Sequence, residues 1–364
     1  MLKKGILLIG LGALVLMSCG RHEEASSGLF RIVLDGKRGY INRKGKVVVA
    51  PQFDQVYRFS ERLAAVQVGS KWGFIDRTGK YVCKPQFDDA NNFSEGLATV
   101  QIGDRWGYIN RTGKVLVIPQ FDRAYSFSEG LAAVRIDDKW GFIDRTGKYV
   151  CKPQFDGIGP FFGFGFSEGL AAVQVGDKWG YINRTGEYVY KPLFDLACDF
   201  SEGLAAVAIG DRWGFIDRTG KYAFASQFDF AVGFAEGLAA VKVGDKLGFI
   251  DRTGKYVCKP QFDRAFGFSE GLVAVQIGDR WGFIDRTGKY AFASQFDFAT
   301  SFSEGRAAVQ VGDKWGYIDR TGEYVCKPQF DWAGSFSEGL APVRVGDKWG
   351  YINKMGRYVW KPTE

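Results

Sequence analysis

Short runs of apolar residues alternate with polar turns along the chain, and the pattern recurs in units of about 34 residues. In the unit over residues 96–121, the segments Leu97–Ile102, Trp106–Asn110 and Val115–Ile118 are rich in β-branched and aromatic residues, which predicts three short strands. Gly103–Asp104 separates the first two segments, and a two-residue loop that begins with glycine predicts a type II′ hairpin. Each unit is therefore expected to form a three-stranded antiparallel β-meander.

The register of the units is marked by a Trp-Gly pair, in which two units replace the tryptophan. The first positions of the ten pairs are Arg38, Trp72, Trp106, Trp140, Trp179, Trp213, Leu247, Trp281, Trp315 and Trp349. A fixed period of this length is typical of an array in which each unit buries its apolar face only against its neighbours. The units leave almost no room for helices, so the fold class is expected to be all-β.

Two architectures are compatible with ten such meanders over residues 28–362. The first is an open β-solenoid-like array, with Phe30–Arg31 and Arg38 capping one end and Trp360 with Pro362 capping the other. The second is a closed β-propeller-like ring, although propellers usually have about four to eight blades. Of the two, the sequence favours the open array.

The connectors between units differ most from copy to copy. A connector such as Asp122–Phe127 is long enough for a single helical turn before Ser-Glu-Gly reverses the chain. One connector is longer than the rest, because residues are inserted within the glycine-rich stretch 157–165. Its aromatic residues Phe161, Phe162 and Phe164 are a candidate contact site for a protein partner or a membrane surface. The alternative is an insertion that arose during duplication and is merely tolerated.

The tryptophan column has two interpretations. Exposed tryptophans could stack on sugar rings, whereas a large ring directly before an unvarying glycine fits the packed core of a repeat array. Leu247 takes the position once without disturbing the register, which favours core packing.

Recurrent carboxylates are expected to close turns. Asp88 and Glu95 recur at the same spacing in most units, whereas a glycosidase needs one pair of acids in one cleft. Asn and Asp alternate in a further column that includes Asn42 and Asp76, so that position needs a hydrogen-bond acceptor and not a charge. The sequence contains no phosphate loop, nucleophile elbow or metal-binding helix motif, and it predicts a protein that is not an enzyme and binds no cofactor.

Cysteine and histidine offer no metal-binding or catalytic pattern. One otherwise apolar column carries four cysteines, which are expected to be buried free thiols: Cys83, Cys151, Cys258 and Cys326. Cys198 lies in a connector and is expected to be the more accessible thiol. The only histidine, His22, lies before the array, so we expect no metal site.

Residues 1–18 have the features of an export signal. Lys3–Lys4 precede an apolar run over residues 5–17 that is too short to span a bilayer. A small residue directly before Cys19 resembles a bacterial lipoprotein signal, which implies cleavage before Cys19 and lipid attachment to its thiol. Residues 19–27 would then be a lipidated N-terminus and tether. The protein is expected to be exported and anchored to the membrane of the cell envelope, at the outer membrane if the cell has one.

The net charge of the chain is +7, which is too small to indicate a nucleic-acid partner. Acidic and basic residues are also interleaved within every unit and do not form one basic stripe.

The motifs Lys-Trp-Gly-Phe-Ile-Asp, Thr-Gly-Lys, Pro-Gln-Phe-Asp and Phe-Ser-Glu-Gly-Leu-Ala resemble those of the bacterial WG (KWG) repeat family, over residues 28–362. The resemblance implies a binding or structural module and transfers no catalytic residues. We therefore expect a non-catalytic lipoprotein scaffold that presents an extended surface to an unidentified protein or envelope partner. The alternative is a glycan-binding or cell-wall-binding module that uses exposed aromatic residues.

Overall fold

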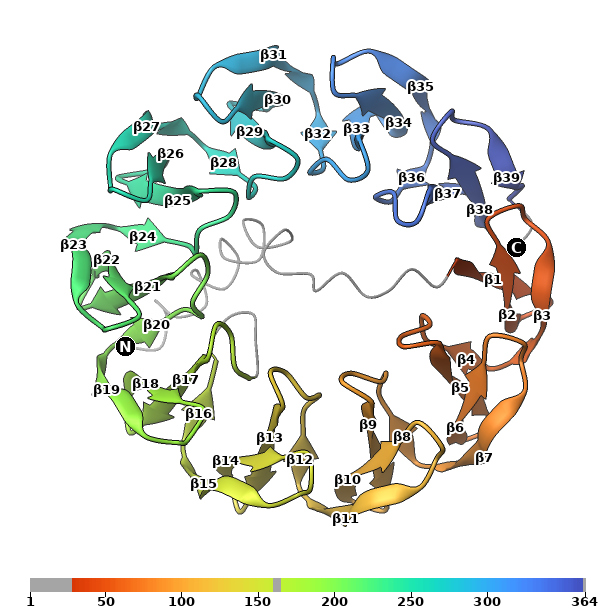
Figure 1. Ribbon diagram of the computed structural model, residues 1–364. Helices are drawn as coiled ribbons and strands as arrows, with labels where there is room; N and C mark the ends of the chain where they lie inside the picture. The colour runs from red at the N-terminus through yellow and green to blue at the C-terminus, as the bar shows by residue number, and fades with distance from the viewer. Residues whose placement is uncertain (1–27, 160–164, 363–364) are drawn as a thin grey trace.

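The computed structural model describes residues 28–159 and 165–362, and within these ranges every regular element is a β-strand. Ten small antiparallel sheets stand side by side in a closed ring, in which the last sheet meets the first (Figure 1). The protein is thus a ten-bladed β-propeller. The closed ring, and not the open array that the sequence favoured, is the architecture that forms. No helix in the described ranges is long and apolar enough to span a membrane.

Each complete blade has four antiparallel strands, ordered from the ring centre to the outer rim (Figure 1). The innermost strands are β4 (Gln55–Val56), β8 (Asp89–Ala90), β12 (Arg123–Ala124), β16 (Gly157–Ile158), β20 (Leu196–Ala197), β24 (Phe230–Ala231), β28 (Arg264–Ala265), β32 (Phe298–Ala299) and β36 (Trp332–Ala333). The second strands are β1 (Leu29–Leu34), β5 (Leu63–Val68), β9 (Leu97–Ile102), β13 (Leu131–Ile136), β17 (Leu170–Val175), β21 (Leu204–Ile209), β25 (Leu238–Val243), β29 (Leu272–Ile277), β33 (Arg306–Val311) and β37 (Leu340–Val345).

The two outer positions are filled in the same way. The third strands are β2 (Lys37–Asn42), β6 (Lys71–Asp76), β10 (Arg105–Asn110), β14 (Lys139–Asp144), β18 (Lys178–Asn183), β22 (Arg212–Asp217), β26 (Lys246–Asp251), β30 (Arg280–Asp285), β34 (Lys314–Asp319) and β38 (Lys348–Asn353). The outermost are β3 (Val47–Phe53), β7 (Tyr81–Phe87), β11 (Val115–Phe121), β15 (Tyr149–Phe155), β19 (Tyr188–Phe194), β23 (Tyr222–Phe228), β27 (Tyr256–Phe262), β31 (Tyr290–Phe296), β35 (Tyr324–Phe330) and β39 (Tyr358–Trp360). We number the blades 1 to 10 in chain order, so that β1–β3 form blade 1 and β36–β39 form blade 10.

The hairpin turns follow from their residues. Gly103 has φ +60° at the first position of its turn, as a type II′ hairpin requires, whereas Asp35 and Gly36 both have positive φ, as type I′ requires. In blade 4 the pair is Asp137–Asp138, and both residues adopt positive φ without glycine. The predicted meander is therefore confirmed turn by turn.

The connector is not the helical turn that the sequence suggested. In blade 4, Arg123–Ala124 pairs with Arg135 and Val134 of β13, and this pair of residues is the innermost strand. The following Ser-Glu-Gly forms a second tight hairpin, in which Glu129 (φ +52°) and Gly130 (φ +78°) take the two type I′ positions. Two residues are too few to show an alternating pattern, which is why the fourth strand was missed.

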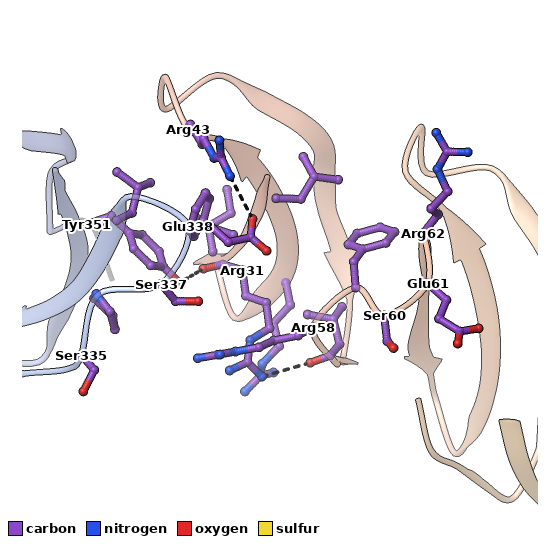
Figure 2. A pocket seen from close by; sticks show the side chains of 18 of the residues that line it. Arg31, Arg43, Arg58, Ser60, Glu61, Arg62, Ser335, Ser337, Glu338 and Tyr351 are labelled. Atoms are coloured by element: carbon purple, nitrogen blue, oxygen red, sulfur yellow. Dashed lines mark hydrogen bonds and ion pairs between the residues drawn. The ribbon is translucent and has the colours of Figure 1, made fainter. Parts of the chain in front are cut away.

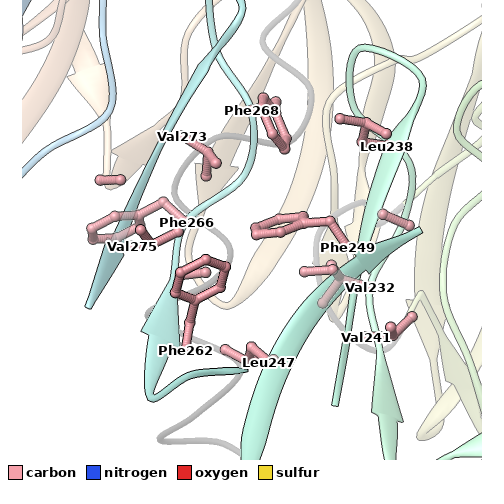
Figure 3. Close-up of a cluster of buried hydrophobic side chains, with 14 of the residues drawn as sticks. Val232, Leu238, Val241, Leu247, Phe249, Phe262, Phe266, Phe268, Val273 and Val275 are labelled. Carbon is pink, nitrogen blue, oxygen red and sulfur yellow. The ribbon is translucent and has the colours of Figure 1, made fainter. Parts of the chain in front are cut away.

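The core lies between blades and not within them. Figure 3 shows the boundary of blades 7 and 8, where Leu247, Phe249 and Phe262 pack against Phe268 and Val275 of the next blade. Apolar side chains from both faces of each sheet are buried in this way, because every blade is covered by a neighbour on each side. A single blade would expose both faces, so the ring as a whole is the unit of stability.

Five cysteines lie in the described ranges, and all are buried free thiols. This confirms the prediction for Cys83, Cys151, Cys258 and Cys326. It contradicts the prediction for Cys198, which is only 6% exposed because the first connector residue turns inward over the blade.

Candidate binding surface at the centre of the ring

The recurrent carboxylates hold turns and blades together. Asp88 accepts a hydrogen bond from the Lys71 ammonium at 2.5 Å and another from the Gly103 amide at 2.8 Å. These donors, with Lys71 first, lower the pKa of Asp88. Glu95 instead reaches the next blade, where its carboxylate accepts from the Gly130 amide at 2.8 Å. The prediction that these acids close turns is confirmed, and Glu95 and its equivalents also link neighbouring blades.

The alternating Asn/Asp column acts as a hydrogen-bond acceptor, as its composition indicated. Oδ1 of Asp76 accepts from the amides of Thr78 at 2.9 Å and Lys80 at 3.1 Å. Oδ1 of Asn110 does the same for Thr112 and Lys114 without a charge. Within the described ranges, no three His, Cys, Asp or Glu side chains are placed to hold a metal ion.

Most of the tryptophan column is core, as predicted. Trp72 is buried and stacks on Tyr57 with ring centroids 4.9 Å apart, and Trp213 is buried against Phe230 of the next blade. The exception is Trp349 in blade 10, whose side chain is 43% exposed.

The first residues of the innermost strands form a column whose chemistry varies around the ring. We call it the inner column: Gln55, Asp89, Arg123, Gly157, Leu196, Phe230, Arg264, Phe298 and Trp332. Its members in blades 2 to 4 are polar, whereas four of the five in blades 6 to 10 are apolar. The pairing of the short strand uses only the backbone of these residues, so the fold leaves their side chains free to vary.

The apolar half of the inner column ends at an exposed tryptophan. Phe298 lies between Trp281 and Trp315, with ring centroids 5.2 and 5.7 Å away, and is half-buried. Trp332 is 38% exposed, and its ring meets that of Trp349 edge to face at 5.2 Å. The guanidinium of Arg344 lies over the Trp349 ring, 6.0 Å from its centroid. This arrangement gives blade 10 an aromatic surface with an adjacent cation.

The boundary between blades 10 and 1, which we call the seam, differs from the other boundaries. Among the described residues, the sheet of blade 1 has three strands, in the order β1, β2 and β3. Several contacts close the ring here, among them an ion pair between Arg43 and Glu338 at 3.8 Å. The Gly28 amide donates to Glu338, the Tyr351 hydroxyl donates to the Arg31 carbonyl at 2.9 Å, and the rings of Phe30 and Tyr351 lie 5.6 Å apart.

A cavity of about 1810 Å³ opens at the seam and reaches toward the ring centre. Arg31 and Arg58 project into it, as does Tyr351 from the opposite side (Figure 2). Burial raises the pKa of Tyr351, while the positive charges of Arg31 and Arg58 act in the opposite direction. Phe30–Arg31 and Arg38 are therefore not caps of a free end, as the open array required, because a closed ring has no free ends. Trp360 likewise lines this cavity.

Comparison with known proteins agrees with this geometry. The model of a family described as "WG containing repeat" matches nine tandem segments, over residues 39–72, 72–106, 106–140, 140–179, 179–213, 213–246, 248–281, 281–315 and 315–349. The chain belongs to the WG repeat family. No curated protein matches this WG-repeat chain.

Solved structures support the ring fold of the WG-repeat chain and nothing more specific. A "Crystal structure of the eukaryotic initiation factor" aligns with a TM-score of 0.54 at 13% identity, over 93% of this chain and 99% of that chain. Hsv2p of Kluyveromyces lactis aligns at 9% identity over 64% of this chain and 92% of that chain, with a TM-score of 0.38. The second score is too low to carry a structural argument.

The sequence-predicted sites of the WG-repeat protein fall outside this geometry. Cys19 and the aromatic residues Phe161, Phe162 and Phe164 lie outside the described residues. Trp332 and Arg58 were missed as site residues. Arg58 stands where the other copies have Asn, Ser, Gly or Asp, so aligning the copies residue by residue could have singled it out.

Proposed function

We propose that this WG-repeat propeller is a non-catalytic binding scaffold, displayed at the bacterial cell envelope, that holds a protein partner on the apolar half of its inner column. The observation that carries the proposal is the pair of exposed rings of Trp332 and Trp349, which meet edge to face. Large aromatic residues at the edge of a packed surface are the side chains that most often dominate binding energy between proteins.

The other recurrent groups support a role without catalysis. The carboxylates that recur in most units are engaged by backbone amides and by lysines or arginines, as Asp88 and Glu95 illustrate for amides and a lysine. Most tryptophans of the Trp-Gly pairs are buried or partly buried in the core. The inner column is thus where this chain carries chemical differences between otherwise equivalent blades.

The test is affinity capture from the native envelope with the full chain as bait, followed by identification of the captured proteins. Trp332→Ser is expected to weaken capture of the principal partner by at least about 30-fold in affinity, as loss of a central aromatic anchor does. Arg123→Ser is the matched control, because Arg123 is an exposed residue at the same position of blade 4. Equal capture by both variants would contradict the proposed surface.

Attachment to the envelope rests on the lipoprotein-like signal that ends at Cys19. We propose that a lipid on Cys19 anchors the scaffold, and Cys19→Ser is then expected to release the protein from the membrane fraction. Retention of this variant on membranes would overturn the lipid anchor without affecting the proposed binding surface.

A glycan-binding function is a second candidate, favoured by the neighbouring exposed rings of Trp332 and Trp349 with Arg344 above the latter. Aromatic faces of this kind can stack on sugar rings. Quenching of tryptophan fluorescence by cell-wall sugars that disappears in Trp332→Ser would favour this candidate over a protein partner.

A further inference from the structure

Four arginines stand at positions where no other copy of the repeat carries a basic residue. Arg31 replaces an alanine found in most copies, Arg38 replaces the tryptophan of the Trp-Gly pair, and Arg58 replaces a small or polar residue. Arg62 replaces the glycine of the Ser-Glu-Gly hairpin and keeps its left-handed backbone, with φ +72°, although that conformation favours glycine. All four arginines line the cavity at the seam. These departures from the repeat therefore meet on one feature of the molecule.

The lining of the cavity has more arginines than carboxylates. It holds six arginines and four glutamates, a formal excess of two positive charges. Each glutamate is already engaged by a glycine amide of the next blade: Glu61 by Gly96, Glu95 by Gly130, Glu304 by Gly339 and Glu338 by Gly28. Three of these glutamates also pair with a cation of the repeat, which is Arg111, Lys354 or Arg43. Within the described ranges, no ion pair joins the four unusual arginines to a carboxylate.

Two of these arginines, Arg31 and Arg58, converge inside the cavity (Figure 2). Arg31 projects from β1, and Arg58 projects from the segment between β4 and β5 of blade 2. Burial raises the pKa of Tyr351 and the charges of both arginines oppose this rise, so both lie near the Tyr351 hydroxyl. Arg31 donates to the Val56 carbonyl at 3.5 Å, which uses one of its five N–H donors. An anion between the two guanidinium groups would relieve their mutual repulsion and use the remaining donors.

The part of the cavity wall that blade 10 supplies is apolar. The exposed rings of Trp332 and Trp349 line it. Pro342 also lines it, and stands in blade 10 at the position that Arg31 takes in blade 1. A ligand that fills the cavity would therefore meet cations from blades 1 and 2 and apolar side chains from blade 10.

The size and chemistry of the cavity favour a peptide over other anions. Its volume of about 1810 Å³ exceeds the roughly 300–1,000 Å³ of sites that bind small molecules. Guanidinium groups bind carboxylates through two parallel hydrogen bonds, which suits Asp and Glu side chains. The headgroups of a bilayer lie in one broad surface, whereas an extended chain is narrow enough to enter a cavity that reaches toward the ring centre.

We infer that the seam cavity binds an acidic peptide segment of the protein partner, with its carboxylates on Arg31 and Arg58 and an apolar side chain against Trp332 and Trp349. The inference rests on the proposed function, because it takes the partner to be a protein, and it adds the chemistry that the partner must present. Arg38 and Arg62 add to the positive potential of the cavity, which favours acidic over basic segments.

Selection from a random dodecapeptide phage library tests the inference, with the full chain and its Arg31→Ala/Arg58→Ser variant as parallel targets. Both replacements restore residues that other copies carry, such as Ala133 and Ser126, so the variant should fold with an unchanged urea midpoint. The Tyr351 hydroxyl bonds the backbone of Arg31, and this ring-closing contact is kept. Asp and Glu should be at least about threefold more frequent among peptides selected on the unaltered chain than among those selected on the variant.

The most enriched peptide is then synthesised in two forms, one with its carboxylates and one with Asn and Gln in their place. The acidic form should bind the unaltered chain at least about tenfold more tightly than the double variant, since two charge-assisted hydrogen bonds are lost. The amide form should bind both proteins equally, because a double-mutant cycle reports coupling only between groups that interact. Arg123→Ser removes an exposed arginine outside the cavity and should bind the acidic form with full affinity.

The inference is overturned if the selected peptides are not enriched in Asp and Glu, or if the effects of the arginine and carboxylate changes are additive. It is also overturned if the arginine pair is instead required for binding to phosphatidylglycerol vesicles and no acidic peptide is selected, which would assign the cavity to a lipid headgroup. Failure of the proposed function is a separate result. Equal capture by Trp332→Ser and Arg123→Ser would contradict the proposed surface, whereas carboxylate-dependent binding at Arg31 and Arg58 would be unaffected.

Discussion

At the scale of single residues, the glycine of the Trp-Gly pair is fixed by its own blade. A Cβ on Gly248 would lie 2.6 Å from both the Cys258 carbonyl oxygen and the Pro260 nitrogen, which are backbone atoms of the outermost strand. The pairing of β26 with β27 shifts register at this point, so the outermost strand bulges over the glycine. The glycine is therefore required by packing within its own blade. Its place beside the tryptophan had instead suggested a role in packing between neighbouring repeats.

Gly248→Ala is therefore expected to lower the free energy of unfolding by about 2 kcal/mol or more, because backbone atoms must move to admit the methyl group. Gly233→Ala is the matched control, since its Cβ would lie 3.6 Å from the Cβ of Ser201, an ordinary contact. Urea denaturation of both variants measures the difference. A Gly248→Ala protein as stable as the control would contradict the bulge.

Acid should destabilise the ring through its aspartates. Hydrogen bonds from Lys71 and Thr78 are the largest causes that lower the pKa values of Asp88 and Asp76 below 3.8, and several equivalents are lowered alike. A carboxylate with a lowered pKa in the folded state stabilises the fold above its unfolded pKa, and this contribution is lost as pH falls through the folded value.

The urea midpoint should consequently stay level between about pH 5 and 8 and fall below about pH 4. The described residues include no histidine, the side chain whose charge ordinarily changes near neutral pH. A midpoint that is constant down to about pH 2 would show that these hydrogen bonds contribute little.

At the scale of elements, neighbouring blades are joined by a serine that reaches the next connector. The Ser201 hydroxyl donates to the Phe234 carbonyl at 2.7 Å, and the Ser269 hydroxyl donates to that of Phe302 at 2.8 Å. Blade 7 breaks this series, because Ala235 stands at the serine position and offers no donor to Phe268.

Ala235→Ser is expected to raise the free energy of unfolding by about 1 kcal/mol by adding the missing hydrogen bond. Ser201→Ala should lower it by a similar amount, which provides the matched reverse change. Both are measured by urea denaturation. If Ala235→Ser is neutral while Ser201→Ala destabilises, the blade 7 connector does not have the geometry described.

The three longer strands of each blade and the turns that join them could be predicted from the sequence. The two-residue innermost strands could not. The II′ and I′ turns depend on local residues such as Gly103 and Asp35, so the pattern is sufficient to predict them. The strand Arg123–Ala124 is recognised only by its pairing with β13. The inner column could therefore not be identified from the sequence. The seam residue Phe30 looks like an ordinary core aromatic until its column is known to hold small residues.

At the scale of the whole molecule, the repeats alone do not decide between a rod and a ring. Contacts between consecutive blades, such as Glu95 with Gly130, would be the same in either form. The difference lies only in contacts between the two ends of the array. The bond from the Tyr351 hydroxyl to the Arg31 carbonyl joins residues 320 positions apart, and no local pattern signals it. Ten equal blades also exceed the usual number for propellers, which is why the open array was favoured.

Small-angle X-ray scattering of the full chain tests the closed ring most directly. A closed ring should give a radius of gyration only somewhat above the roughly 20 Å expected of a compact chain of this length, with a pair-distance distribution confined to the ring diameter. An open array of about thirty stacked strands would extend about 140 Å and give a radius of gyration near 40 Å. The account predicts the compact ring, and a rod-like profile would contradict it.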